Sequence, residues 1–269
     1  MSSFHEPLTE RAIRAALAHA PFVREVVYLP SVGSTNDAAD DLAAQGAAHA
    51  TLVVTDDQTA GRGRMARSWY MPPRAAIALS ILVRPDLPAV HANRLTMLAG
   101  LAAAEGMEQV TGLAVMLKWP NDVVVSDAQR RTLKMGGILT ECAIAGDHIE
   151  YAVVGIGLNV NVDFADAPNL AGIATSARMQ LGREVDRLSV LAAVVARFAA
   201  RFDGLTAGDG LLAAWAARLV TLRRRVEARA GAQAWVGLAE AVDDDGALLL
   251  RTDDGALHRL LAADVTLHV

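Results

Sequence analysis

The feature that most constrains the fold is a long β-hairpin pattern in the middle of the chain. Residues Leu133–Val162 read LKMGGILTECAIAGDHIEYAVVGIGLNVNV, in which two apolar stretches flank Gly146-Asp147. A glycine beside an aspartate between two such stretches is typical of a hairpin turn. Glycines also stand near the outer ends of both stretches, where they let the backbone approach a ligand or a neighbouring strand closely. The pattern predicts two adjacent antiparallel strands within a sheet.

Further helices and strands are predicted along the chain from helical spacing, capping residues and short apolar runs. The predicted helices cover Leu8–Ala20, Ser34–Gly46, His91–Val110, Arg187–Leu205 and Gly210–Val220. The predicted strands outside the hairpin cover Phe22–Leu29, Thr51–Thr55, Ala75–Arg84 and Ala114–Trp119. Runs of strands with helices on one side favour an α+β fold over a doubly wound sheet.

The pattern changes after an arginine run at residues 223–225. Downstream, short apolar stretches alternate with acidic turns, as in VDDDGALLL and TDDGALHRL. Short strands separated by such turns are typical of a small β-barrel. We therefore predict two domains, residues 1–221 and residues 222–269.

Composition and charge exclude several classes of protein. The formal net charge of −5 argues against a general nucleic-acid binder, while it leaves room for a local basic patch. The single cysteine, Cys142, permits no intrachain disulfide and excludes a zinc site built from several cysteines. The N-terminal residues lack an apolar signal core, and no apolar run approaches the roughly 18 residues of a membrane helix. We expect a soluble, cytoplasmic protein with no membrane partner.

The segment QTAGRGRMARSW, Gln58–Trp69, concentrates positive charge on a flexible stretch of chain. It holds three arginines, Arg62, Arg64 and Arg67, together with two glycines. Guanidinium groups pair with carboxylates and phosphates, and closely spaced arginines repel one another unless an anion lies among them. The segment lacks the Gly-Lys-Ser/Thr ending of a P-loop, which excludes that class of site. An exposed solvated loop is the alternative, but Trp69, which can stack on a base, favours a nucleotide or acyl-phosphate ligand.

Two further segments place polar groups at the end of a predicted element. Ser34–Asn36 (STN) starts a predicted helix, where such residues are usually a simple cap. The alternative is a cluster of hydrogen-bonding groups suited to a polar ligand. Lys118–Asp122 (KWPND) ends a predicted strand, where it is either a turn or a site. A lysine there can neutralise phosphate, and Asp122 can bind Mg²⁺ directly or through water.

Glycines mark the remaining candidate segment. Lys134 precedes Gly136-Gly137, and GIGLN, residues 155–159, closes the second strand of the hairpin. A third glycine and a following helix are missing, which excludes a Rossmann dinucleotide site. Lys134 stands beside two glycines, so it can reach a ligand with little steric obstruction.

Together these segments resemble the biotin protein ligases. Ser-Thr-Asn, Gln-Thr-x-Gly-Arg-Gly-Arg ending in Trp, Lys-Trp-Pro-Asn-Asp, Lys-x-x-Gly-Ile-Leu-x-Glu and Gly-x-Gly-x-Asn follow the order of that family from Ser34 to Asn159. The C-terminal segment is similar to the family's small SH3-like domain, so the resemblance covers nearly the whole chain. It implies a mixed β-sheet with helices packed on one side in residues 1–221, and an SH3-like β-barrel in residues 222–269.

The resemblance also implies a two-step reaction. Biotin and MgATP form biotinyl-5′-adenylate and pyrophosphate, and the adenylate then acylates one lysine of the biotin carboxyl carrier domain of acetyl-CoA carboxylase or a related carboxylase. Biotin's carboxylate is already ionised at neutral pH, so the first step needs no general base. It needs arginines, lysines and a metal to hold two anions together, and a loop that excludes water.

The family motifs imply a role for each candidate residue. The predicted catalytic residues are Lys134, Arg64 and Lys118. The residues predicted to bind biotin are Ser34, Thr35, Asn36, Gln58, Gly61, Arg62, Gly63, Arg64, Lys134, Gly137, Gly155 and Gly157. The residues predicted to bind ATP are Arg67, Trp69, Lys118, Asn121 and Asn159, and Asp122 is the predicted magnesium contact. In this scheme Arg62 and Arg64 neutralise the biotin carboxylate and the α-phosphate.

Two departures from the family bear on these expectations. Met65-Ala66 stands where many relatives have Arg-Gly, which removes one positive charge and one glycine. Some relatives carry a winged-helix domain ahead of the catalytic part, whereas only 33 residues precede Ser34 here. We therefore expect no DNA-binding domain and a monofunctional ligase.

Two alternative functions stay open from the sequence. A lipoate-protein ligase shares the general architecture, and a non-catalytic sensor would bind biotin or its adenylate without reaction. The presence of both Lys118 and Lys134 favours an enzyme over a sensor. The expected assembly is a monomer or a homodimer.

Overall fold

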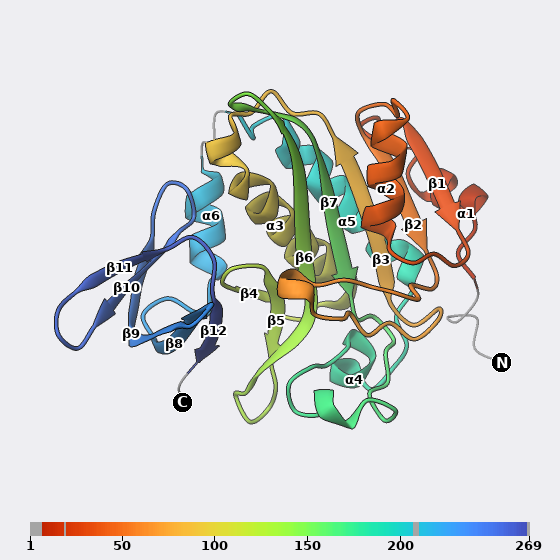
Figure 1. Ribbon diagram of the computed structural model, residues 1–269. Helices are drawn as coiled ribbons and strands as arrows, with labels where there is room; N and C mark the ends of the chain where they lie inside the picture. The colour runs from red at the N-terminus through yellow and green to blue at the C-terminus, as the bar shows by residue number, and fades with distance from the viewer. Residues whose placement is uncertain (1–6, 19, 207–209, 268–269) are drawn as a thin grey trace.

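A seven-stranded sheet of order β1-β2-β3-β7-β6-β5-β4 forms the larger part of the computed structural model, which describes residues 7–18, 20–206 and 210–267 (Figure 1). Its strands are β1 (Glu25–Leu29), β2 (Thr51–Thr55), β3 (Ile77–Val83), β4 (Met116–Lys118), β5 (Asp122–Ser126), β6 (Thr132–Ala145) and β7 (His148–Leu158). β1 and β2 are parallel, while the other neighbouring strands are antiparallel. The mixed sheet is confirmed.

The predicted hairpin is β6 and β7. They pair from Gly136↔Leu158 to Ala145↔His148 across a turn at Gly146, whose φ of 64° lies in the left-handed region that favours glycine. The sequence analysis missed β5, which returns along β4 directly after the Lys118–Asp122 segment. That segment is therefore both a turn and the link between β5 and the edge strand β4.

Helices cover both faces of the main sheet. They are α1 (Glu10–Ala16), α2 (Thr35–Ala44), α3 (Asn93–Thr111), α4 (Ala177–Leu181), α5 (Arg187–Phe202) and α6 (Leu211–Arg218). The expectation of one covered face holds for α3 and α5, which lie together behind the sheet in Figure 1. α2 lies on the opposite face, where Ala39 packs with Val53 and Leu82. All residues of β3 are buried, as expected for a central strand covered on both sides.

The predicted first helix, α4 and α5 compare differently with the sequence analysis. The predicted first helix extends over His19, which lies outside the described residues. The short α4 has no counterpart in the sequence analysis, whereas α5 begins after Asp186, whose carboxylate accepts hydrogen bonds from the amides of Leu188 and Ser189. None of the helices in the described part of the chain is long and apolar enough to cross a membrane.

A second, antiparallel sheet of five strands ends the chain, in the order β11-β10-β9-β8-β12. Its strands are β8 (Arg225–Ala230), β9 (Gln233–Val242), β10 (Leu248–Thr252), β11 (Leu257–Leu260) and β12 (Asp264–Leu267). Trp119 connects it to the main sheet, because its buried indole Nε1 donates to the Gly246 carbonyl at 2.9 Å. Gly246 has a φ of 75°, and a Cβ there would lie 2.1 Å from Met97 Cε. Glycine is therefore required where the two sheets meet.

A buried ion pair fixes the end of β2. Arg187 Nη1 lies 2.5 Å from Asp56 Oδ1, and the two side chains are 1% and 4% exposed. The Tyr28 hydroxyl and the Leu8 amide each donate to the other carboxylate oxygen at 2.8 Å. Burial, followed by the Asp56 hydrogen bond, raises the pKa of Tyr28 to about 12. One carboxylate thus joins β1, β2, α5 and the N-terminal segment.

We predict that Arg187→Gln lowers the free energy of unfolding by about 3–5 kcal/mol, because Asp56 would then be a buried charge without its counter-ion. Urea denaturation followed by circular dichroism measures this loss. Arg225→Gln is the control, since Arg225 pairs with Asp253 in solvent and its loss should barely move the midpoint. Equal effects of the two substitutions would contradict the role given to the buried pair.

Candidate active site

A cavity of about 400 Å³, here called the large cavity, lies between the main sheet and β12. Its walls come from the start of α2, the Gln58–Trp69 segment (the basic loop), the Lys118–Asp122 segment, the glycine-rich ends of β6 and β7, and β12. Of the predicted site residues, those that line it are Ser34, Thr35, Asn36, Gln58, Arg62, Gly63, Arg64, Arg67, Trp69, Lys118, Asn121, Asp122, Lys134, Gly137, Gly155, Gly157 and Asn159. Gly61 is the one predicted site residue outside this lining.

The basic loop folds back on itself. The Gly63 amide donates to the Arg67 carbonyl at 2.7 Å, and the Trp69 amide donates to the Gly61 carbonyl at 2.8 Å. A Cβ at Gly61 would lie 3.0 Å from the Trp69 carbonyl oxygen, so glycine permits this close return. Met65, one of the departures from the family, lies at the exposed tip with a φ of 55°.

The α2 end of the cavity is a cluster of hydrogen-bonding groups. The Thr35 amide and hydroxyl both donate to Gln58 Oε1, at 2.8 and 3.1 Å. The buried Ser80 hydroxyl lies 2.8 Å from Thr35 Oγ1 and 2.6 Å from Asn36 Oδ1. Ser34 is the N-cap residue, yet its side chain makes no capping hydrogen bond. The simple-cap interpretation therefore fails for Ser34, and its hydroxyl is left for the cavity.

Two basic side chains of the large cavity have carboxylate partners. Lys134 Nζ lies 2.5 Å from Asp122 Oδ1, and 5.8 Å from the centroid of the Trp69 ring. Arg67 pairs with Asp264 of β12, which brings the C-terminal sheet into the site. These pairs already balance part of the positive charge in the cavity.

Arg64 and Lys118 have no carboxylate within salt-bridge distance in the part of the chain that the structure describes. The hydrogen bond described for the Arg64 guanidinium goes to the neutral amide oxygen of Asn121, at 3.5 Å. Burial lowers the pKa of both Arg64 and Lys118, because the charged forms lose solvent. Two partly buried cations that form no salt bridge within the described part of the chain face the same cavity, which suits it to an anionic ligand.

The chain contains only two lysines, Lys118 and Lys134, and both line the large cavity. Every other basic side chain outside the histidines is an arginine. The two amines of the cavity are therefore chemically distinct from the rest of the basic surface.

Two glycines of β7 make room for side chains of the site. A Cβ at Gly155 would lie 2.2 Å from Asn36 Oδ1, and one at Gly157 would lie 2.8 Å from Trp69 Cε2. Trp69 Nε1 and Asn159 Oδ1 are buried and have no hydrogen-bond partner among the described residues. One unsatisfied donor and one unsatisfied acceptor on the lining indicate a polar ligand that would complete them.

Two parts of the lining contain no residue that the sequence analysis assigned to the site; the first follows Asn161, where the resemblance implies a loop that orders around the adenylate. Phe164, Leu170, Ile173 and Ala174 come from an irregular segment that packs on Trp69 and Tyr70, and residues 263–266 come from the C-terminal sheet. The irregular segment has no periodicity that could have revealed it. It is held by backbone bonds between Lys134 and residues 173 and 175, both at 2.8 Å.

Comparisons with known proteins agree with this geometry. The sequence model of the Biotin/lipoate A/B protein ligase family matches residues 28–159, and that of the Biotin protein ligase C terminal domain matches residues 221–267. Fold and site thus define a ligase of the biotin/lipoate class.

Two individual relatives, both ligases by name, identify the family within this class. The chain is 34% identical over 263 residues to the bifunctional ligase/repressor BirA of Bacillus subtilis, covering 97% of this chain and 79% of that protein. It is 33% identical over 275 residues to the biotin--[acetyl-CoA-carboxylase] ligase of Mycobacterium tuberculosis, covering 98% of this chain and 96% of that one. The chain belongs to the biotin protein ligase family.

A solved structure supports the same fold. The biotin protein ligase from Aquifex aeolicus, in complex with biotin and ATP, superposes with a TM-score of 0.75 at 25% sequence identity. The match covers 91% of this chain and 99% of that one.

We predict that Gly157→Ala displaces the Trp69 indole and lowers the free energy of unfolding by about 1–3 kcal/mol, because the added methyl group overpacks the cavity wall. Tryptophan fluorescence and urea denaturation measure the two effects. Gly33→Ala is the control, since a Cβ at Gly33 meets nothing within 4 Å. If both variants matched the wild type, the packing of Gly157 against the indole would be refuted.

Proposed function

We propose that this chain is a biotin protein ligase that activates biotin with MgATP and transfers it to a lysine of a biotin carboxyl carrier domain. The observation that carries the proposal is a pair of partly buried cations on the wall of the large cavity, Arg64 and Lys118, which have no carboxylate within salt-bridge distance among the described residues. Family membership supports the choice of biotin, and the ligase names of the relatives support an enzyme rather than a sensor.

In the first step a biotin carboxylate oxygen attacks the α-phosphorus of ATP. A C–O–P linkage forms, the bond from that phosphorus to the bridging oxygen breaks, and pyrophosphate leaves. No proton moves, so the barrier lies in bringing two anions together and in stabilising the charge that develops on phosphate oxygens. Arg64 and Lys118 supply positive charge where solvent is partly excluded, which makes each charge more effective than in water.

In the second step the neutral amine of the carrier lysine attacks the acyl carbon of the adenylate. A C–N bond forms, the bond to the AMP oxygen breaks, and one proton is released with AMP. The adenylate must survive until the carrier arrives, so water has to be kept from the same carbon. The basic loop, folded over the cavity wall, is the segment suited to this task.

The proposed ligand positions follow the unsatisfied groups of the cavity. The Ser34 hydroxyl, with Thr35 and Gln58, suits the polar ureido ring of biotin. Trp69 and Asn159, each with an unpaired buried polar atom, suit the adenosine part of ATP. In this arrangement biotin extends from α2 towards Arg64, and ATP extends from Trp69 towards Lys118.

Asp122 is proposed as a contact for magnesium carried by ATP. Among the described residues there is no group of three or more His, Cys, Asp or Glu side chains that could hold a metal ion. Magnesium bound to a nucleotide needs only one or two carboxylates, with phosphates and water as its other ligands. Asp122 fits that requirement, although it is also the partner of Lys134. When bound, the ion neutralises phosphate charge.

The domain division proposed from the sequence fits this scheme. Residues 1–221 supply the substrate-binding walls, and residues 222–269 supply Asp264 on β12. The Arg67–Asp264 pair supports a role for the C-terminal domain in holding the nucleotide side of the cavity.

The test of the proposed function is pyrophosphate release from MgATP with biotin, with lipoate or with neither, before any carrier is added. We expect release with biotin alone, followed by biotin transfer when a carrier domain is supplied. Release with lipoate alone would move the chain to the lipoate ligases. Biotin binding without release would identify a sensor.

We predict that Lys118→Met slows adenylate formation by about 10²–10³-fold, because it removes a preorganised charge at the developing anion. The same change should raise the free energy of unfolding of the ligand-free protein, since a partly buried charge without a partner disappears. Single-turnover kinetics and urea denaturation measure the two effects. The control is the exposed Arg183→Met, for which both should stay near wild type. Full activity in the Lys118 variant would exclude the role proposed for Lys118.

A further inference from the structure

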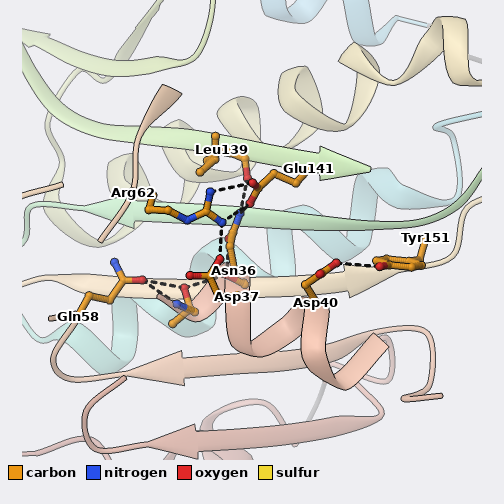
Figure 2. Close-up of polar contacts among 10 residues, drawn as sticks. Asn36, Asp37, Asp40, Gln58, Arg62, Leu139, Glu141 and Tyr151 are labelled. Carbon is orange, nitrogen blue, oxygen red and sulfur yellow. Dashed lines mark hydrogen bonds and ion pairs between the residues drawn. The ribbon is translucent and has the colours of Figure 1, made fainter. Parts of the chain in front are cut away.

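Glu141 lies on β6 outside the lining of the large cavity, yet it binds two residues of that lining. Its carboxylate accepts hydrogen bonds from Asn36 Nδ2 at 2.7 Å and from Arg62 Nη1 and Nη2 at 2.9 and 3.0 Å (Figure 2). Asp37 of α2 accepts a further bond from Arg62 Nη2, at 2.5 Å. These four residues, here called the Glu141 network, join α2, β6 and the basic loop.

The network leaves the Asn36 amide in one orientation. Its Nδ2 donates to Glu141 and to the Leu139 carbonyl, and its Oδ1 lies 2.6 Å from the Ser80 hydroxyl. The absence of a side chain at Gly155 gives the amide the space that it occupies. Asn36 is only 4% exposed, so both of its donor hydrogens and one acceptor site are used within the protein.

Arg62 differs from Arg64 in the same loop. The resemblance to the family implies that both neutralise anionic substrate groups. The Arg62 guanidinium, however, already faces the carboxylates of Glu141 and Asp37, whereas Arg64 has no carboxylate partner among the described residues. An arginine that is satisfied by two carboxylates is suited to holding the loop in place, and Arg64 is left to meet the substrate anion.

We propose that Glu141 is a positioning residue, which tethers the basic loop to α2 through Arg62 and orients Asn36, so that the biotin side of the cavity is formed before substrate binds. The choice of biotin as the substrate rests on the proposed function, whereas the tether itself does not. Glu141 touches neither substrate in this scheme and acts only through Asn36 and Arg62.

The exposure of the carboxylates decides what kind of effect to expect. The side chains of Glu141 and Asp37 are 41% and 57% exposed. Ion pairs in such positions add little to global stability, because solvent screens them. The network therefore acts on the position of one loop, and its loss should leave the unfolding midpoint nearly unchanged.

The first experiment compares trypsin cleavage after Arg64 and Arg67 in the ligand-free protein. Glu141→Gln should speed cleavage in the basic loop about fivefold, since the loop opens more often without its tether. Asp40→Asn is the matched control, because it removes the charge from the carboxylate that accepts the 2.8 Å bond from Tyr151, another contact between α2 and the sheet that does not involve the loop (Figure 2). Cleavage of the Glu141 variant at the wild-type rate would overturn the proposal.

The second experiment is a double-mutant cycle on biotin affinity, measured by calorimetry with Arg62→Gln, Glu141→Gln and the double variant. A tether predicts that each single change raises the Kd for biotin about five- to tenfold, that the double variant binds like Glu141→Gln, and that the KM for ATP is unchanged. If the increases in Kd caused by the two single changes multiply in the double variant, Arg62 contacts the substrate directly. That outcome would overturn the tether. If the wild type binds no biotin, the proposed function fails, and the trypsin comparison still decides the tether.

Discussion

The buried ion pair between Asp56 and Arg187 holds in place the end of β2 from which the basic loop of the site starts. Asp56 directly follows β2, and its carbonyl also accepts a hydrogen bond from the Arg74 amide at 2.8 Å. Asp56 therefore fixes both ends of the segment from Asp56 to Arg74 that contains the basic loop. Neither charge of the pair is stable alone in that environment, so the geometry is held as a unit. The two ends of the segment that contains the loop are thereby fixed to the sheet.

The basic residues of the site differ in the number of carboxylate partners that each has, and this number indicates the role of each residue. Arg62 has two carboxylate partners, Lys134 and Arg67 have one each, and Arg64 and Lys118 have none among the described residues. A fully paired cation is a structural element, and a partly buried one that forms no salt bridge is suited to pairing with an anionic ligand. Family motifs treat the loop arginines alike, whereas their partners in the structure separate them.

Local signals in the sequence were sufficient for much of this structure. The hairpin turn at Gly146 and the start of α5 at Arg187 were predicted from short stretches of chain. The candidate segments that line the large cavity were recognised as motifs in the same way, whereas the roles given to their residues came from the resemblance to the family. Contacts between distant stretches were not predictable in this way, such as the approach of Asp264 to Arg67. The position of α2 on the second face was not predictable either, because β3 is buried throughout and, apart from Ser80, apolar, so that it shows no alternation. Glu141 was part of a motif, but its role depends on Asn36 and Arg62, which only the fold brings near it.

The restriction of both lysines to the large cavity has a chemical consequence for the enzyme itself. An acyl adenylate reacts with accessible primary amines, and outside the cavity the basic side chains of the enzyme are arginines and histidines, with no lysine among them. Guanidinium groups stay protonated at neutral pH and are poor nucleophiles. Within the cavity, Lys134 is engaged by Asp122, and Lys118 lies where phosphate is expected. A chain of this composition therefore offers no lysine side chain outside the cavity to the intermediate that it makes.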